Sequence, residues 1–145
     1  MTKCKKVMTK NLVCCLPNDT VTKAAELMKS ENVGSIPVVE NEQTEKLVGI
    51  VTDRDLTLKV LAEGLDAKST KVEAVMTRKV VTCRAGTDLQ KALDVMSRHH
   101  LRRIPIVNSD NKILGMISQA DVAIHYDHPK RTAAMVKGIS RSFAK

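Results

Sequence analysis

The stretches GIVTDRD (49–55) and GMISQAD (115–121) share one pattern, in which an apolar run ends at a hydroxyl residue and an aspartate follows three positions later. Each stretch is preceded by IPVV (36–39) or IPIV (104–107), and each copy opens with VMT, at 7–9 and at 75–77. The copies are offset by 68 residues up to the IPVV stretch and by 66 after it. With one short gap, roughly fifty positions of the two copies therefore align in register, which indicates a tandem duplication.

Each copy carries the hydrophobic pattern of the same five elements. A β-branched apolar run (12–15 and 80–83) predicts a first strand. A helix follows, with apolar residues spaced i, i+3, i+4, i+7: Val21, Ala24, Ala25 and Met28, matched by Leu89, Ala92, Leu93 and Met96. Thr87 and Gln90 have the spacing of a capping box at the start of the second of these helices.

Two strands separated by a polar loop come next (36–39 and 47–52; 104–107 and 113–118), and a second helix follows at once (53–62; 119–126). The order β-α-β-β-α, repeated, predicts an α/β (α+β) fold. A unit of about fifty residues buries little surface alone, so we expect two repeats packed sheet against sheet around one shared core.

These patterns divide the chain into four parts. Residues 1–62 are the first repeat with a basic N-terminal segment, 63–74 a connector, 75–126 the second repeat, and 127–145 a basic C-terminal helix or tail. Gly64 is expected to stop the helix before the connector. In the last part we expect Pro129 to open a helix and Gly138 to close it.

The net charge of +8 is concentrated at the two ends of the 145-residue chain. Residues 1–10 and 128–145 contain nine Lys and Arg and no acidic residue, which leaves the body near neutral. Such ends are either solvated or contact a phosphate-rich or acidic partner. No apolar run approaches the length of a membrane span, so we expect a soluble, cytoplasmic protein without a membrane partner. The four cysteines include no Cys-x-x-Cys pair, and we expect buried, reduced thiols.

The repeated VMT, Ile-Pro and Thr/Ser-x-x-Asp motifs resemble those of a tandem cystathionine-β-synthase (CBS) domain pair, over about residues 7–126. The resemblance is to stand-alone prokaryotic pairs, including the hypoxic-response kind. It implies a pseudo-two-fold module with two clefts for adenosine-containing ligands such as AMP, ADP, ATP or S-adenosylmethionine. It also implies a homodimer that regulates a partner protein and needs no obligatory cofactor.

The residues at the strand ends support two interpretations of their own. Thr52 and Ser118 each end a strand and start a helix, where free backbone N–H groups suit an anion. Asp55 and Asp121 lie one turn further on, where a carboxylate can accept hydrogen bonds from a ribose diol. The same Thr/Ser-x-x-Asp spacing is also that of a capping box, which would only hold the helix start.

The resemblance pairs each of these motifs with the loop and strand of the other repeat. It implies a first cleft of Thr52, Asp55, Arg102, Arg103, Ile104 and Pro105, and a second of Ser118, Asp121, Gly34, Ser35, Ile36 and Pro37. Two guanidinium groups favour a phosphorylated ligand in the first cleft. The second cleft has no cation in its loop and favours an uncharged adenosyl group or none.

Other functions have less support in the sequence. It contains no P-loop, GxGxxG, Gly-x-Ser-x-Gly or His-Glu-x-x-His motif, so we expect no enzyme. His125 and His128, with Cys83 or Asp127, lack a convincing full set of zinc ligands. The alternative to a ligand sensor is a nucleic-acid or protein interaction module that uses its basic termini and has vestigial clefts.

Overall fold

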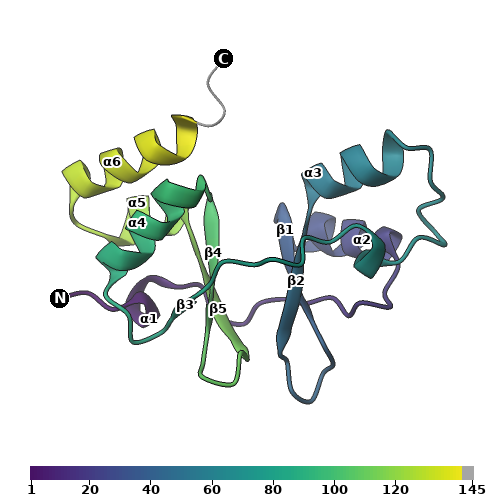
Figure 1. Cartoon of the computed structure of the whole chain (residues 1–145), viewed down its shortest axis with the longest axis horizontal. Coiled ribbons are helices and arrows are strands. Elements are labelled where there is room, and N and C mark those ends of the chain that lie inside the picture. Colours follow the sequence, from purple (N-terminus) through teal and green to yellow (C-terminus); the bar gives the residue numbers. More distant parts are fainter. Residues whose placement is uncertain (142–145) are drawn as a thin grey trace. The chain divides into compact units, whose positions relative to one another are not determined.

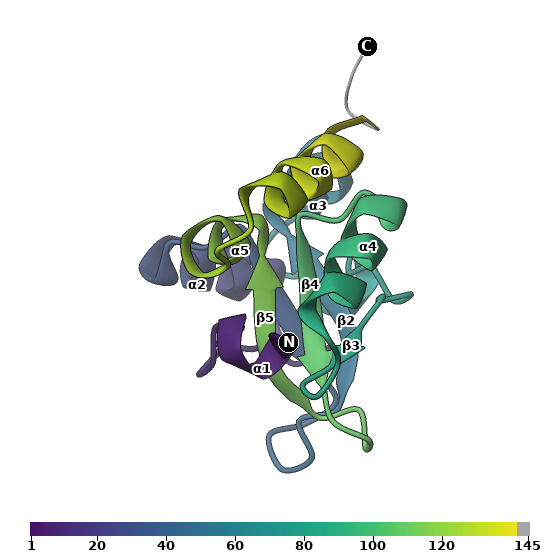
Figure 2. The ribbon, with the colours of Figure 1, turned by 90° about the vertical axis from the view of Figure 1, so that its left-hand side faces the viewer.

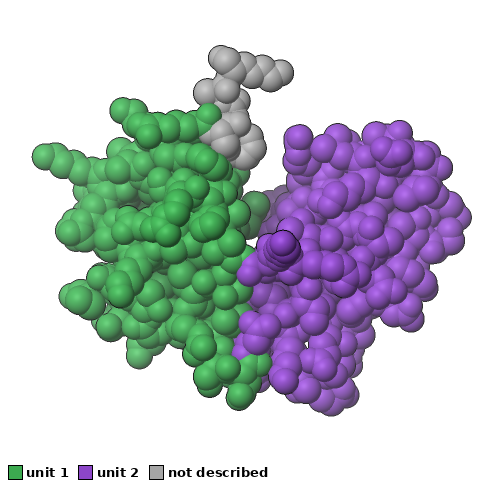
Figure 3. Space-filling view, viewed as in Figure 1, with its two compact units in different colours: residues 1–11, 81–110, 114–145 green, residues 12–80, 111–113 purple. Residues whose placement is uncertain are grey.

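The computed structural model describes residues 1–141, and Phe143 and Lys145 lie outside the described residues. The chain forms two compact units (Figures 1 and 3). Among the described residues, unit 1 contains Met1–Asn11, Val81–Asp110 and 114–141, and unit 2 contains Leu12–Val80 with Asn111–Ile113. Each unit has its own cluster of buried apolar side chains, and the core shared between the repeats stays a prediction.

Unit 2 is built on an antiparallel hairpin of β1 (Ser35–Val39) and β2 (Leu47–Thr52). Helix α2 (Val21–Glu31) precedes the hairpin and begins at Thr20, whose side chain accepts a hydrogen bond from the Lys23 backbone N–H. After β2 the chain forms α3 (Asp53–Leu56), a π-helical turn η1 (Thr57–Leu61) and, later, a short 3₁₀ turn η2 (Val72–Ala74). Gly64 has a φ of 69° and ends this helical segment as predicted.

Unit 1 repeats the arrangement with three strands in the order β3-β4-β5. Its elements are α1 (Cys4–Val7), β3 (Cys83–Arg84), α4 (Leu89–His99), β4 (Arg103–Val107), β5 (Ile113–Ser118) and α5 (Gln119–His125), followed by α6 (Pro129–Ser140). Helix α6 packs on α4 and α5 (Figure 2).

The first segment of each sequence repeat packs in the unit that holds the other repeat's hairpin. Thr9 exchanges backbone hydrogen bonds with Met116 of β5 (2.8 and 3.0 Å), and Thr77 does the same with Ile50 of β2 (2.8 and 2.9 Å). Gly115 and Gly49 lie beneath these segments, against Met8 and Met76. The compact units therefore differ from the stretches 1–62 and 75–126, which describe repeats in sequence.

Several local expectations need correction. The first strands are reduced to a bridge between Cys15 and Val38 and to the two-residue β3, because each has a partner along only a short part of its length. The cap of α4 is Asp88, which accepts from the Gln90 N–H, so the predicted Thr87–Gln90 box is wrong. Ala25 of the expected apolar stripe is exposed.

The predicted end of the C-terminal helix is also wrong. Helix α6 begins at Pro129 as predicted but runs through Gly138 to Ser140. Gly138 meets the side chain of Ser97 on α4, and a Cβ there would collide with it. This glycine therefore serves helix packing rather than helix termination.

Candidate functional site

Thr52 and Asp55 form a complete capping box where β2 passes into α3. The Asp55 N–H donates to Thr52 Oγ1 at 3.1 Å, and the Thr52 N–H donates to Asp55 Oδ2 at 3.0 Å. Ser118 and Asp121 repeat this geometry at the start of α5, with distances of 3.0 and 2.9 Å. The capping interpretation of both motifs is confirmed, and it occupies one carboxylate oxygen of each aspartate.

The second carboxylate oxygen differs between the two sites. Oδ1 of the buried Asp55 lies 2.9 Å from Nζ of Lys59, which also donates to the Val75 carbonyl at 2.8 Å. Oδ1 of Asp121 instead accepts from the Thr9 hydroxyl at 3.1 Å. The two copies thus present different electrostatics, with an ammonium group beside one aspartate and a neutral hydroxyl beside the other.

Lys59 is a residue of this site that the sequence motifs do not include. The spacing of Asp55 and Lys59 could have indicated this ion pair, since a lysine four positions after an aspartate lies on the same helix face. At the repeat offset of 66, its counterpart is His125, which is exposed at the end of α5. Lys59 donates to the Val75 carbonyl and so connects the candidate carboxylate of Asp55 to the backbone at the start of the second repeat.

The loops that precede β1 and β4 lie beside the capping box of their own repeat. The Asp53 N–H donates to the Gly34 carbonyl at 2.9 Å, and Ser35 pairs with Thr52 across the hairpin. In unit 1 the Gln119 N–H donates to the Arg102 carbonyl at 2.9 Å. The structure brings each motif together with the loop of the same repeat, and the crosswise pairing into two clefts stays a prediction.

Exposure separates the remaining candidate residues into two groups. Arg102 and Arg103 are exposed, while Gly34 and Ser35 are half-buried. The four apolar candidates that begin the inner strands are buried: Ile36, Pro37, Ile104 and Pro105. Polar recognition in the loops therefore falls to the two arginine side chains and to Ser35.

The cysteine and histidine residues form no metal centre in the described chain. Within residues 1–141, no group of three or more His, Cys, Asp or Glu is placed to hold a metal ion. Burial raises the pKa of the Cys4, Cys14 and Cys15 thiols to about 11. His128 packs against Tyr126, with ring centroids 4.8 Å apart. None of the described helices has both the length and the apolar character needed to cross a membrane.

Comparison with known proteins identifies the family to which these repeats belong. A family model for the CBS domain matches residues 4–62 and 72–127. The chain belongs to the CBS domain family. A relative in Bacillus subtilis, the uncharacterized protein YlbB, is 40% identical over 140 residues, which cover 97% of this chain and 93% of that protein.

Solved structures confirm the fold class and the resemblance to stand-alone CBS pairs. Hypoxic response protein 1 of Mycobacterium tuberculosis is 30% identical over 125 residues, covering 86% of this chain and 85% of that protein. The crystal structure of Hypoxic Response Protein I, which has two coordinated zinc ions, matches with a TM-score of 0.77 at 29% identity and covers 86% of this chain and 98% of that one. The CBS domain pair of protein MJ0100, in complex with 5′-methylthioadenosine and S-adenosylmethionine, matches with a TM-score of 0.75 at 25% identity, covering 86% and 94%.

Proposed function

We propose that this CBS pair is a regulatory module that binds an adenosine-containing ligand and signals its presence to a partner protein, acting as a cytoplasmic homodimer. The observation that carries the proposal is the duplicated strand end, where Thr52 with Asp55 and Ser118 with Asp121 have the same geometry. The MJ0100 pair, of similar fold, binds 5′-methylthioadenosine and S-adenosylmethionine. AMP, ADP, ATP and S-adenosylmethionine are the compounds to test here.

The chemistry of the aspartates suits a ribose. In each capping box one carboxylate oxygen is used by the backbone, and the other can accept from a sugar hydroxyl once its present donor moves. At Asp121 the donor to be replaced is the neutral Thr9 hydroxyl, and at Asp55 it is the Lys59 ammonium group. An ion pair holds a carboxylate more strongly than a hydroxyl does. The Asp121 site is therefore the readier of the two for an adenosyl compound that carries no phosphate.

The Asp55 site is suited to a phosphorylated ligand instead. Lys59 can turn from the carboxylate to a phosphate oxygen, since its side chain is about half exposed. In the crosswise pairing that the family resemblance implies, Arg102 and Arg103 add two guanidinium groups to this site, and these bind phosphate in bidentate fashion. A change of partner by Lys59 would also release the Val75 carbonyl, which offers a route from ligand binding to the start of the second repeat.

Thermal unfolding at fixed ionic strength tests the proposal with each of the four compounds. A ligand at 100 times its Kd adds about 2.7 kcal/mol of stability. We expect the Asp121→Ala variant to lose the shift given by S-adenosylmethionine, and the Asp55→Ala and Arg102→Ala/Arg103→Ala variants to lose that given by AMP. Each variant is compared with its own ligand-free midpoint, which separates binding from the loss of the cap. If no compound shifts the wild-type midpoint at millimolar concentration, the motifs are caps only and the proposal fails.

A further inference from the structure

The positive charge of the chain is gathered on one of its two compact units. Within residues 1–141, unit 1 contains thirteen Lys and Arg residues against five Asp and Glu, whereas unit 2 contains ten against eleven. The exchange of first segments contributes to this difference, because it places the four lysines of residues 1–11 in unit 1. Both units are built on the same repeat, so the difference lies in surface side chains and not in what the fold requires.

A basic patch forms where α1 lies beside β3 and the start of α4 (Figures 1 and 2). The Lys5 N–H donates to the Ala85 carbonyl at 3.0 Å, and the Leu89 N–H donates to the Thr2 carbonyl at 2.8 Å. These bonds hold the N-terminal segment against the loop between β3 and α4. The basic patch consists of five residues from these three elements: Lys3, Lys5, Lys6, Arg84 and Lys91.

The charges of the basic patch are not neutralised by neighbouring acids. Four of the five side chains are exposed, and Lys3 is half-buried. None of them forms an ion pair within residues 1–141. One acidic residue, Asp88, lies between Arg84 and Lys91 in the sequence, and its carboxylate caps α4 by accepting from the Gln90 N–H at 3.2 Å. The patch therefore keeps a strong positive charge at the surface.

The backbone beneath the patch is repeated in unit 2. There the Glu73 N–H donates to the Pro17 carbonyl at 3.0 Å. At the repeat offset of 68, this is the counterpart of the bond between Lys5 and Ala85. The duplication thus provides two copies of one backbone arrangement, whose side chains can be compared position by position.

The equivalent surface of unit 2 has no excess charge. In order, its residues are Lys71, Glu73, Ala74, Leu16 and Lys23. A glutamate, an alanine and a leucine thus replace three cations, and Lys23 is paired with Asp19 at 3.4 Å. Because the same backbone forms without the positive charge, folding does not account for the basic patch.

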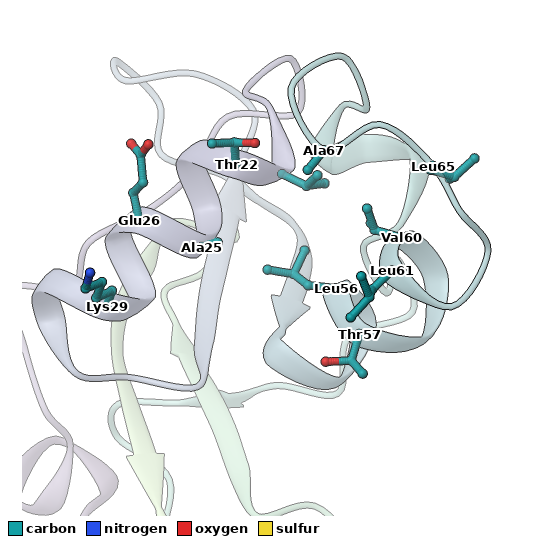
Figure 4. A pocket seen from close by; sticks show the side chains of 11 residues that line it. Thr22, Ala25, Glu26, Lys29, Leu56, Thr57, Val60, Leu61, Leu65 and Ala67 are labelled. Carbon is teal, nitrogen blue, oxygen red and sulfur yellow. The ribbon is translucent and has the colours of Figure 1, made fainter.

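The composition of the basic patch suits a nucleic acid better than a protein. Protein interfaces are depleted in lysine and have an apolar centre, as in the depression of about 440 Å³ between α2 and the α3–η1 segment, which is lined mainly by Leu, Val and Ala (Figure 4). Nucleic-acid interfaces are more polar and much more positive. One large exposed apolar side chain, Met1, borders the patch, and residues 1–141 contain no exposed Phe, Tyr or Trp for base stacking.

We propose that the basic patch of unit 1 binds the phosphate backbone of a nucleic-acid duplex without reading its sequence. Lys and Arg side chains donate to phosphate oxygens, and their binding releases counterions from the duplex. A duplex presents its phosphates in a stiff, regular array, which suits cations on elements joined by backbone hydrogen bonds. The proposal does not depend on the adenosine ligand, because no residue of the patch belongs to either predicted cleft.

The probe is a fluorescein-labelled DNA duplex of about 20 base pairs, whose binding to the full chain is followed by fluorescence anisotropy between about 50 and 200 mM KCl. Each phosphate contact contributes about −0.9 to the slope of log K against log salt, so five contacts predict a slope of about −4 to −5. A second duplex of unrelated sequence should bind equally. The patch variant Lys5→Glu/Lys6→Ala/Arg84→Leu gives unit 1 the residues that unit 2 carries at these positions. It should bind at least tenfold more weakly, with a slope smaller in magnitude by about 2 to 3.

The matched control is Lys29→Glu/Lys68→Ala/Lys79→Ala, which removes the same charge from three exposed positions of unit 2 and should leave the affinity unchanged. Circular dichroism of both variants establishes that they are folded. The proposal is overturned if the wild type does not bind the duplex at the lowest salt concentration, or if the patch variant and the control bind it equally. It is also overturned if poly-L-glutamate of the same total charge displaces the labelled duplex as well as an unlabelled duplex does. The patch would then fit an acidic protein.

Discussion

Replacing Gly49 by alanine should destabilise the protein, because the Thr77 segment leaves no room above β2 for a side chain. A Cβ at this position would lie 2.6 Å from Met76 Sδ and 2.9 Å from the Thr77 carbonyl oxygen. The methionine can rotate away, but the Thr77 backbone is fixed by its two hydrogen bonds to Ile50. The strand or the Thr77 segment must therefore shift, at the expense of those bonds.

The expected loss of folding stability in the Gly49→Ala variant follows from two opposing effects. Forcing an extra methyl group into a packed site costs about 1–3 kcal/mol. Alanine recovers about 0.5–1 kcal/mol, because glycine loses more conformational freedom when it is held in a strand. The free energy of unfolding should fall by about 1–2 kcal/mol, and the midpoint temperature by roughly 2–4 °C for each kcal/mol in a chain near 150 residues. Urea unfolding followed by circular dichroism measures the first quantity and calorimetry the second.

Gly86→Ala is the matched control, since no atom lies within 4 Å of a Cβ built there and its φ is not positive. Its stability should stay within about 0.5 kcal/mol of the wild type. Gly115→Ala should behave like Gly49→Ala, because its Cβ would lie 2.8 Å from both Met8 Sδ and the Thr9 carbonyl oxygen. Equal stability of the Gly49 and Gly86 variants would refute this account of the close approach.

Three other changes test the description of the sites and the core. Thr52→Ala removes the cap of α3 and should cost about 1 kcal/mol in urea unfolding, whereas an unchanged midpoint would mean that the cap adds nothing. Lys59→Met removes the partly exposed ammonium group beside Asp55 and the hydrogen-bond donor to the Val75 carbonyl, so the free energy of unfolding should fall by up to about 1 kcal/mol. His125→Met, the control at the equivalent position of the second repeat, should leave the free energy of unfolding unchanged. Burial raises the Cys15 pKa from 9.0 to about 11, so the folded state holds this proton more tightly. That contribution to the free energy of unfolding is complete below pH 9 and is lost as the pH rises to 11. Cys15→Val should therefore reduce the fall of the free energy of unfolding between pH 9 and 11. An unchanged fall over this range would contradict the raised pKa of Cys15.

The inner strands and both strand-end motifs follow from the sequence because their cause is local. Ile113–Ser118 and Leu47–Thr52 form strands at the predicted bounds, since apolar side chains and a terminal hydroxyl residue specify a strand that passes into a helix. The capping boxes follow from spacing alone. These features need no knowledge of which segments meet in three dimensions.

The missed features depend on contacts between segments that are distant in sequence. Gly138 has the composition signal of a helix end, and only the approach of Ser97 shows that it serves packing. The first strands form so few ladder bonds because their partners are set by tertiary pairing, as in the bridge of Cys15 to Val38. The role of Lys59 required the position of Val75, sixteen residues further along the chain. Propensity patterns do not contain such pairings.

The exchange of first segments has a consequence for the order of folding during synthesis. Residues 12–80, which make up nearly all of unit 2, leave the ribosome early and find their partners close at hand. Thr9 has to wait for Asp121, 112 positions later, before its side chain is bound. Closing so long a loop is slow, because its entropy must be lost before any contact compensates. The segment that carries Thr9 is thus made long before its partners, and a nascent chain released before β5 is complete leaves Thr9 without its bonds to Met116 and Asp121.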